Sequence, residues 1–269
     1  MPLFHIVVLA LIQGLTEFLP VSSSAHLVLP SELLNWPDQG LAFDVAVHVG
    51  TLAAVLLYFR RDFMLLIYGW LRQVSGGGTS YHARLGWMLI VGTVPAVAAG
   101  LLFNDFIEQH LRSMLVIGIA TVVFGVLLGW ADHARTERRI SRDMRFSDVM
   151  IIGCAQALAL IPGTSRSGIT ITAGLMLGLR RKAAARFSFY LSAPLILAAG
   201  SYKTLELIQM GERAPWLDIS LGAGLSAVSA YACIHVFLVL LNRIGMWPFV
   251  LYRLLLGTAL VGVWMMLPA

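Results

Sequence analysis

Six stretches of this sequence are long enough and apolar enough to cross a lipid bilayer. A helix needs about 20 apolar residues to cross a hydrocarbon core of roughly 30 Å. Only 12% of the 269 residues are charged, whereas soluble domains have about 25%. The sequence therefore predicts an all-α integral membrane protein, a polytopic helical bundle that forms one domain over residues 1–269. The six predicted spans are Leu41–Phe59, Leu85–Phe103, Met114–Trp130, Phe187–Leu205, Ile219–Leu241 and Pro248–Leu267.

Two further apolar stretches, Met1–Leu33 and Ser147–Leu179, are each interrupted near the middle by a short polar turn that follows a proline. Each half is too short to cross the bilayer. Backbone outside a helix is tolerated at that depth only where protein or water surrounds it. Each stretch is therefore predicted to form a re-entrant helical hairpin, which enters and leaves on the same side.

The basic residues are distributed unevenly between the two sides of this arrangement. The loops of one side carry most of the 19 Lys and Arg, and the loops of the other side carry Arg112, Lys203 and Arg213. Because cytoplasmic loops of membrane proteins are enriched in Lys and Arg, the first side is predicted to be cytoplasmic. Both termini then lie outside, the two hairpins enter from opposite sides, and the net charge of +5 needs no nucleic-acid partner. The predicted cytoplasmic residues are Arg60, Arg61, Arg72, Arg84, Arg135, Arg138, Arg139, Arg142, Arg145, Arg180, Arg181, Lys182, Arg186 and Arg243.

The two halves of the chain look like repeats. Pro20 with its serines matches Pro162 with its serines, and an Arg-rich cytoplasmic linker over residues 131–148 separates pseudo-repeats of about 1–130 and 147–269. A hairpin plus three spans makes an odd number of crossings, so the second copy is inverted. Inverted repeats whose broken helices meet near the midplane are typical of transporters. A lipid-phosphate flippase or transporter is therefore a second interpretation beside an enzyme.

The first polar turn contains ionisable residues. Gln13 and Glu17 are four residues apart and share one helix face. Ser22 follows, and Ser23 and His26 can also face the same way, three residues apart. Serines at the start of a helix are common caps. A carboxylate and an imidazole inside a membrane are costly, however, so Glu17 and His26 indicate function.

The second polar turn has the composition of an anion site. Arg166 offers a fork of N–H donors suited to phosphate oxygens, and the helix that follows presents free N–H groups and the positive end of its dipole. The alternative is a structural ion pair between Arg166 and Glu17, and both can hold together. Arg253, inside the last apolar run, could reach the same phosphate or have a snorkelling or pairing role. The hydroxyls predicted to bind the phosphate are those of Ser165, Ser167 and Thr170, together with Ser22 of the first turn.

Together the turns supply what phosphoryl transfer needs: a nucleophile, an acid–base group and charge clamps. Ser23 or His26 could attack, and Glu17 could assist directly or through a divalent cation. Gln13 and Glu17 carry oxygen donors of the kind that Mg²⁺ or Ca²⁺ takes, although two ligands are a weak metal signal. No organic cofactor is predicted.

Asp44 and His48 lie four residues apart near the outer end of the first span, and so share a helix face. They are predicted either to line an entrance or to satisfy polar neighbours.

The two turns resemble the paired motifs of the undecaprenyl-diphosphate phosphatase family, the bacitracin-resistance type of bacterial inner membranes. The family's Glu/Gln-x-x-x-Glu segment that runs into a Ser/His stretch stands here as Gln13–His26, and its Pro-Gly-x-Ser-Arg-Ser-Gly motif stands as Pro162–Gly168. Gln13 is the allowed variant of the first Glu, and it weakens any two-carboxylate metal site. Ala25 stands where glycine is common. The resemblance covers essentially the whole chain.

This resemblance implies hydrolysis of undecaprenyl diphosphate to undecaprenyl phosphate and phosphate, which recycles the lipid carrier of peptidoglycan synthesis and confers bacitracin resistance. It also implies an inner-membrane protein whose active site faces the periplasm, acting on a polyprenyl diphosphate lipid; a homodimer is compatible with it. By position, Glu17, Ser23, His26 and Arg166 take the family's catalytic and phosphate-binding roles. Between Ser23 and His26 as the nucleophile, Ser23 is slightly favoured.

Overall fold

The computed structural model describes residues 1–34, 36–136, 138–210 and 215–266, and these residues form eleven α-helices and no β-strand. Six of the helices are long and apolar enough to span a membrane. Each predicted span overlaps one of them, which confirms a multi-pass helical membrane protein; Arg213 and the predicted span end at Leu267 lie outside the described residues. The six helices are α3 (Gly40–Tyr58), α5 (Tyr81–His110), α6 (Met114–Ala134), α9 (Arg181–Met210), α10 (Trp216–Ile244) and α11 (Trp247–Met266).

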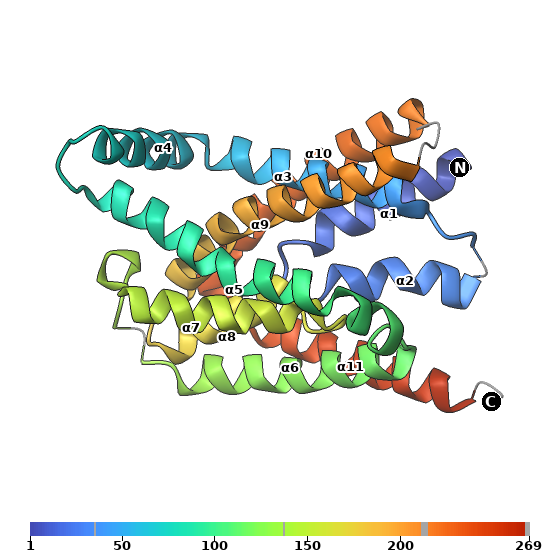
Figure 1. Ribbon diagram of the computed structural model, residues 1–269. Helices are drawn as coiled ribbons and strands as arrows, with labels where there is room; N and C mark the ends of the chain where they lie inside the picture. Colours follow the sequence, from blue (N-terminus) through green and yellow to red (C-terminus); the bar gives the residue numbers. More distant parts are fainter. Residues whose placement is uncertain (35, 137, 211–214, 267–269) are drawn as a thin grey trace.

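Four shorter helices form the two predicted hairpins. The first hairpin joins α1 (Leu3–Thr16) to α2 (Ser23–Leu34). The second runs from α7 (Phe146–Ala157) through a 3₁₀ turn, η2 (Leu158–Leu160), to α8 (Arg166–Met176). Figure 1 shows α1 and α2 at the end of the bundle that carries both termini, whereas α7 and α8 return to the opposite end. The polar turns of the hairpins therefore meet inside the bundle.

Each hairpin packs against a helix of the other half of the chain. Helix α1 packs on α10, and α7 packs on α5. Helix α3 packs on α10 and α9, and α6 packs on α11. The halves are thus interlocked, as two inverted repeats would be, while the repeat boundaries remain a prediction.

The contact of α1 with α10 depends on a glycine. A Cβ atom at Gly14 would lie 1.9 Å from Ser229 Oγ and 2.6 Å from the carbonyl oxygen of Ser226. We expect Gly14→Ala to lower the free energy of unfolding by about 1–3 kcal/mol, the usual effect of overpacking. Thermal unfolding of the purified protein in detergent measures it. Gly224→Ala is the control, since a Cβ there meets nothing within 4 Å; equal melting temperatures for both variants would contradict the close contact.

Helix α4 (Arg60–Val74) occupies a segment that the sequence pattern assigned to a basic loop. This helix exposes large apolar side chains, among them Met64, Ile67 and Tyr68, and begins with two arginines. A charged helix with one exposed apolar face is typical of a segment that lies along a membrane surface. Its 15 residues are too few for a span, so the pattern of long apolar stretches does not predict this helix.

The basic linker before the second hairpin is held in place by Arg139. Its guanidinium donates to the Asp148 carboxylate at 2.5 Å and to the carbonyl oxygen of Leu177 at 2.9 Å. Burial raises the pKa of Asp148, but the hydrogen bonds from Arg139 and from the Arg145 N–H outweigh it, and the pKa lies below its ordinary value. The linker thereby ties together the two ends of the second hairpin.

Candidate functional site

The two polar turns have the same backbone bend at matching serines. Ser22 and Ser165 have φ angles of 72° and 69°, and they are the two non-glycine residues of the described chain with positive φ. Each immediately precedes a helix, α2 or α8, and each hydroxyl lies 3.2 Å from that of the serine two residues later, Ser24 or Ser167. Backbone strain of this kind concentrates at functional sites. The chain therefore repeats a serine with positive φ at the same place in both turns.

Arg253 holds the two turns together. Its buried guanidinium donates to the carbonyl oxygens of Gly163 and Thr164 at 2.9 Å each, and of Pro20 at 3.4 Å. Its Nε donates to the carbonyl of Thr121 at 3.1 Å. A phosphate contact was one of the roles predicted for Arg253. The structure instead directs this guanidinium at backbone carbonyls, and Arg253 is not among the residues that line the cavity described below.

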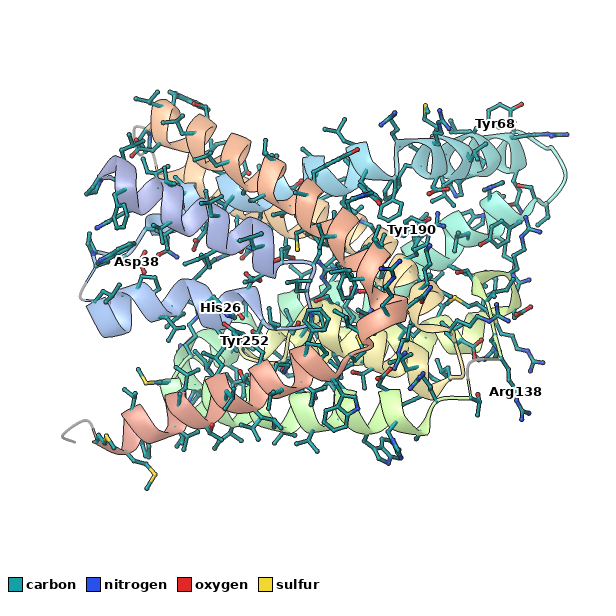
Figure 2. All side chains as sticks on the ribbon, turned by 180° about the vertical axis from the view of Figure 1, so that it is seen from behind. His26, Asp38, Tyr68, Arg138, Tyr190 and Tyr252 are labelled. Carbon is teal, nitrogen blue, oxygen red and sulfur yellow. The ribbon has the colours of Figure 1, made fainter. Side chains whose placement is uncertain are left out.

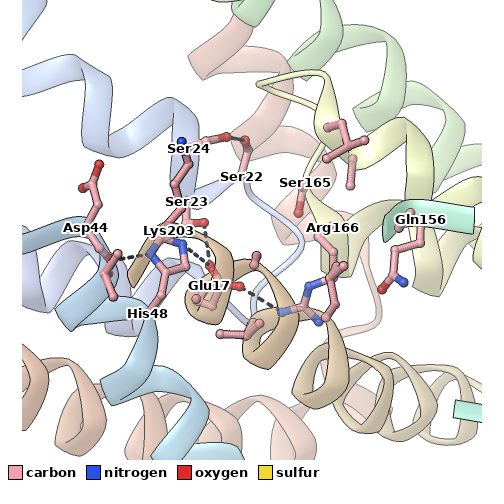
Figure 3. A pocket seen from close by; sticks show the side chains of 18 of the residues that line it. Glu17, Ser22, Ser23, Ser24, Asp44, His48, Gln156, Ser165, Arg166 and Lys203 are labelled. Atoms are coloured by element: carbon pink, nitrogen blue, oxygen red, sulfur yellow. Dashed lines mark hydrogen bonds and ion pairs between the residues drawn. The ribbon is translucent and has the colours of Figure 1, made fainter. Parts of the chain in front are cut away.

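The carboxylate of Glu17 lies between the turns (Figure 3). Its Oε1 accepts a hydrogen bond from Arg166 Nη2 at 2.9 Å, and its Oε2 accepts bonds from Ser23 Oγ at 2.8 Å and Gln13 Nε2 at 3.0 Å. The side chains of Glu17 and Arg166 are only 8% and 10% exposed, so the predicted structural ion pair is formed. Ser23 and Arg166 occupy matching positions in the two turns, directly after Ser22 and Ser165. Equivalent residues of both hairpins thus converge on one carboxylate.

A cavity of about 570 Å³ opens beside this cluster. Polar residues line one part of it: Glu17, Ser22, Ser23, Ser24, His48, Gln156, Ser165 and Arg166. Four further charged residues line it: Asp38, Asp44, Arg112 and Lys203. Its apolar wall includes Leu41, Val45, Ala96, Ala159, Leu160, Leu195, Ile196 and Ala199. Asp38 marks the end of the bundle toward which the cavity extends, opposite Arg138 and Tyr68 (Figure 2). A concave site with one apolar wall and convergent polar groups suits an amphiphilic ligand.

His26 does not join the cluster. Its Nδ1 donates to the carbonyl oxygen of Ser22 at 2.7 Å, and its Nε2 is hydrogen-bonded to the Tyr252 hydroxyl. The two rings are stacked, with centroids 5.5 Å apart (Figure 2). His26 is not among the residues that line the cavity. Both ring nitrogens are therefore engaged away from it, and the predicted catalytic role of His26 stays a prediction.

Two of the predicted phosphate-binding hydroxyls are bonded within the protein. Ser167 Oγ donates to the carbonyl oxygen of Leu19 at 2.8 Å, across the two turns. Thr170 Oγ1 donates to the carbonyl of Arg166 at 2.8 Å and lies 2.7 Å from Ser188 Oγ. Both residues are buried and are absent from the cavity lining. The hydroxyls of Ser22 and Ser165 belong to residues that do line it.

The predicted metal ligands do not present two oxygens to one point. Gln13 directs its Nε2 donor at Glu17, and its Oε1 is buried without a hydrogen-bond partner among the described residues. The Arg166 guanidinium already occupies the other oxygen of that carboxylate. Nor do three His, Cys, Asp or Glu side chains of the described chain cluster as metal ligands. The predicted divalent cation therefore stays a prediction, and no chemical step is assigned to a metal.

Two cavity residues carried weak or no signal in the sequence. His48 was predicted to line an entrance or to satisfy polar neighbours, and its Nε2 lies 4.0 Å from Glu17 Oε2. Gln156 was not singled out, although its separation from Gln13 equals that of Ser165 from Ser22. This regular spacing between the halves could have identified it.

Comparison with known proteins places the chain in a family. The model of the family described as bacitracin resistance protein BacA matches residues 6–259. A Teredinibacter turnerae protein named undecaprenyl-diphosphatase is 64% identical over 260 residues, which cover 97% of this chain and 98% of that protein. A Hahella chejuensis protein of the same name is 60% identical and covers 97% of each chain. The chain therefore belongs to the bacitracin resistance protein BacA family.

Proposed function

We propose that the protein is a membrane-embedded undecaprenyl-diphosphatase, which hydrolyses undecaprenyl diphosphate to undecaprenyl phosphate and phosphate. The names of its relatives support this activity. The observation that carries it is the Ser23 hydroxyl, hydrogen-bonded to a buried carboxylate that also holds Arg166, in a cavity with an apolar wall. The reaction recycles the lipid carrier of peptidoglycan synthesis and accounts for bacitracin resistance.

The geometry supports one role for each of three side chains. Ser23 Oγ attacks the terminal phosphorus, and Glu17, 2.8 Å away, takes the serine proton as the new O–P bond forms. The bridging P–O bond breaks, and its electron pair leaves with undecaprenyl phosphate. Arg166 and the N-terminus of α8 stabilise the charge on the phosphoryl oxygens. Water then cleaves the phosphoserine and releases phosphate.

The cavity also accounts for the lipid part of the substrate. Ala96 of α5 and Leu195 of α9 lie on its apolar wall, each directly after a proline inside its helix, Pro95 or Pro194. Prolines remove helical hydrogen bonds and are tolerated in spans where neighbouring groups compensate. The prenyl chain runs along this wall while the diphosphate meets Arg166.

The basic linkers favour one orientation in a bacterial inner membrane. Arg138 and Tyr68 lie at one end of the bundle and Asp38 at the other (Figure 2). With the basic end in the cytoplasm, the cavity opens to the periplasm. The partners of the protein are then the polyprenyl diphosphate and the surrounding lipid, with no nucleic acid, and a homodimer is compatible with this arrangement.

Ser23→Ala is expected to reduce phosphate release by at least about 10³-fold, since no other group replaces the nucleophile. The measurement is phosphate release from undecaprenyl diphosphate by the purified protein in detergent. Ser31→Ala on the same helix is the control; its hydroxyl bonds the Val28 carbonyl and is expected to be dispensable. Near-normal release by Ser23→Ala would exclude it as the nucleophile. A wild-type protein that binds the lipid without releasing phosphate would favour the transporter.

A further inference from the structure

We infer that His48 is the general base that activates water for hydrolysis of the phosphoserine intermediate. The inference rests on the proposed function, because it concerns the second half of the same reaction. It assigns to α3 a catalytic residue for a reaction whose other working groups lie on the two hairpins.

The ring of His48 has a defined tautomer. Its Nδ1 lies 2.7 Å from the carbonyl oxygen of Asp44. A carbonyl oxygen can only accept, so Nδ1 carries the hydrogen, and the basic nitrogen of the neutral ring is Nε2. This nitrogen is 4.0 Å from Glu17 Oε2, beyond hydrogen-bond distance.

The position of that nitrogen suits a base for water. His48 lines the cavity, and its side chain is 37% exposed (Figure 3). Ser23 Oγ and His48 Nε2 both flank the same carboxylate oxygen of Glu17, at 2.8 Å and 4.0 Å. Both atoms therefore lie close to one carboxylate oxygen, and the inference places the attacking water between His48 Nε2 and the phosphoryl group on Ser23. His26, on α2 of the first hairpin, has its Nε2 bonded to Tyr252 instead.

A second base completes the proton balance when Glu17 keeps the proton of Ser23. Once Glu17 has taken the proton of Ser23, it is no longer a base when water must attack. His48 Nε2 then takes a proton from the water as its oxygen bonds to phosphorus. The bond between phosphorus and Ser23 Oγ breaks, and Glu17 returns its proton to that oxygen.

The carboxylates of Glu17 and Asp44 stabilise this final state. As His48 becomes an imidazolium, Glu17 becomes a carboxylate again, so the two new charges are opposite and close. Asp44, on the same helix, also lines the cavity. Arg166 of α8 and Lys203 of α9 line it too, and their positive charges favour release of the proton from the imidazolium. The proton then passes from His48 to solvent through the open cavity.

The test is a labelling experiment on His48→Gln with undecaprenyl diphosphate carrying ³²P in its terminal phosphate. Glutamine retains an amide donor but cannot take up a proton. We expect turnover to fall about 10²- to 10⁴-fold, while label accumulates on the protein toward one phosphate per chain. In the double variant with Ser23→Ala the label should disappear. His26→Gln is the matched control, expected to accumulate no more label than the wild type, whatever its turnover.

The outcomes separate this inference from the proposed function. Wild-type turnover in His48→Gln, or slow turnover without bound label, would overturn the role of His48 while leaving the phosphatase intact. Label that accumulates in His26→Gln but not in His48→Gln would transfer the role to His26. Absence of phosphate release by the wild-type protein would instead contradict the proposed function itself.

Discussion

Arg166→Ala is expected to reduce phosphate release from undecaprenyl diphosphate by at least about 10³-fold, a loss typical of a charge clamp in phosphoryl transfer. Two effects combine. The variant removes the cation that faces the phosphoryl oxygens, and it leaves the Glu17 carboxylate, only 8% exposed, without its ion-pair partner. An unpaired buried carboxylate tends to take up a proton, and a protonated Glu17 cannot accept the proton of Ser23. Phosphate release by the purified variant measures the combined loss.

Two further variants separate catalysis by Arg166 from folding. Breaking a buried ion pair costs about 3–5 kcal/mol of stability, and removing both partners costs much less. The double variant with Glu17→Gln should therefore recover much of the melting temperature lost by Arg166→Ala, without recovering phosphate release. Arg166→Lys keeps the charge but loses the planar fork that also reaches the Ser188 carbonyl, and intermediate activity is expected. Recovery of activity along with stability in the double variant would show that the pair is structural.

The sequence predicts the features that follow from length and apolarity alone. The six spans are confirmed because a run of about 20 apolar residues has few alternatives to a membrane helix. The two hairpins follow from polar, proline-containing turns that no single span could accommodate. The ion pair between Glu17 and Arg166, one of the two interpretations of the second turn, is also confirmed.

The directions of individual side chains depend on packing that no local pattern contains. Ser23 and His26 are three residues apart and could share a face, yet Tyr252, on a helix far along the chain, engages the His26 ring outside the cavity. Thr170 carries a hydroxyl near the phosphate site, but in a buried helix it bonds a preceding carbonyl instead. His48 reaches the cluster from α3, whereas its spacing from Asp44 predicted only an entrance or polar neighbours for it.

Arg253→Met is expected to lower the stability of the protein more than either Gly14→Ala or Arg166→Ala. Methionine fills much of the same volume but has no donor, so the carbonyls of Gly163, Thr164 and Thr121 lose bonds of 2.9, 2.9 and 3.1 Å. Gly163 keeps only a long bond of 3.3 Å from Thr121 Oγ1, and each buried acceptor left without a good bond costs about 1–3 kcal/mol. A lower melting temperature in detergent is the readout, with Arg243→Met as the control because Arg243 is exposed.

The same variant decides between a clamping and a phosphate-binding role for Arg253. A clamp on both turns predicts that stability and phosphate release fall together, because the turns that carry Ser23 and Arg166 lose their common anchor. A phosphate ligand predicts an unchanged melting temperature with a raised KM. The clamp is favoured by the surroundings of the guanidinium, which is fully buried and bonded to the carbonyls of Gly163 and Thr164. It can reach a phosphate only if those hydrogen bonds are broken. In a membrane interior, which offers the freed carbonyls no water, that exchange would disrupt the turn that positions the substrate.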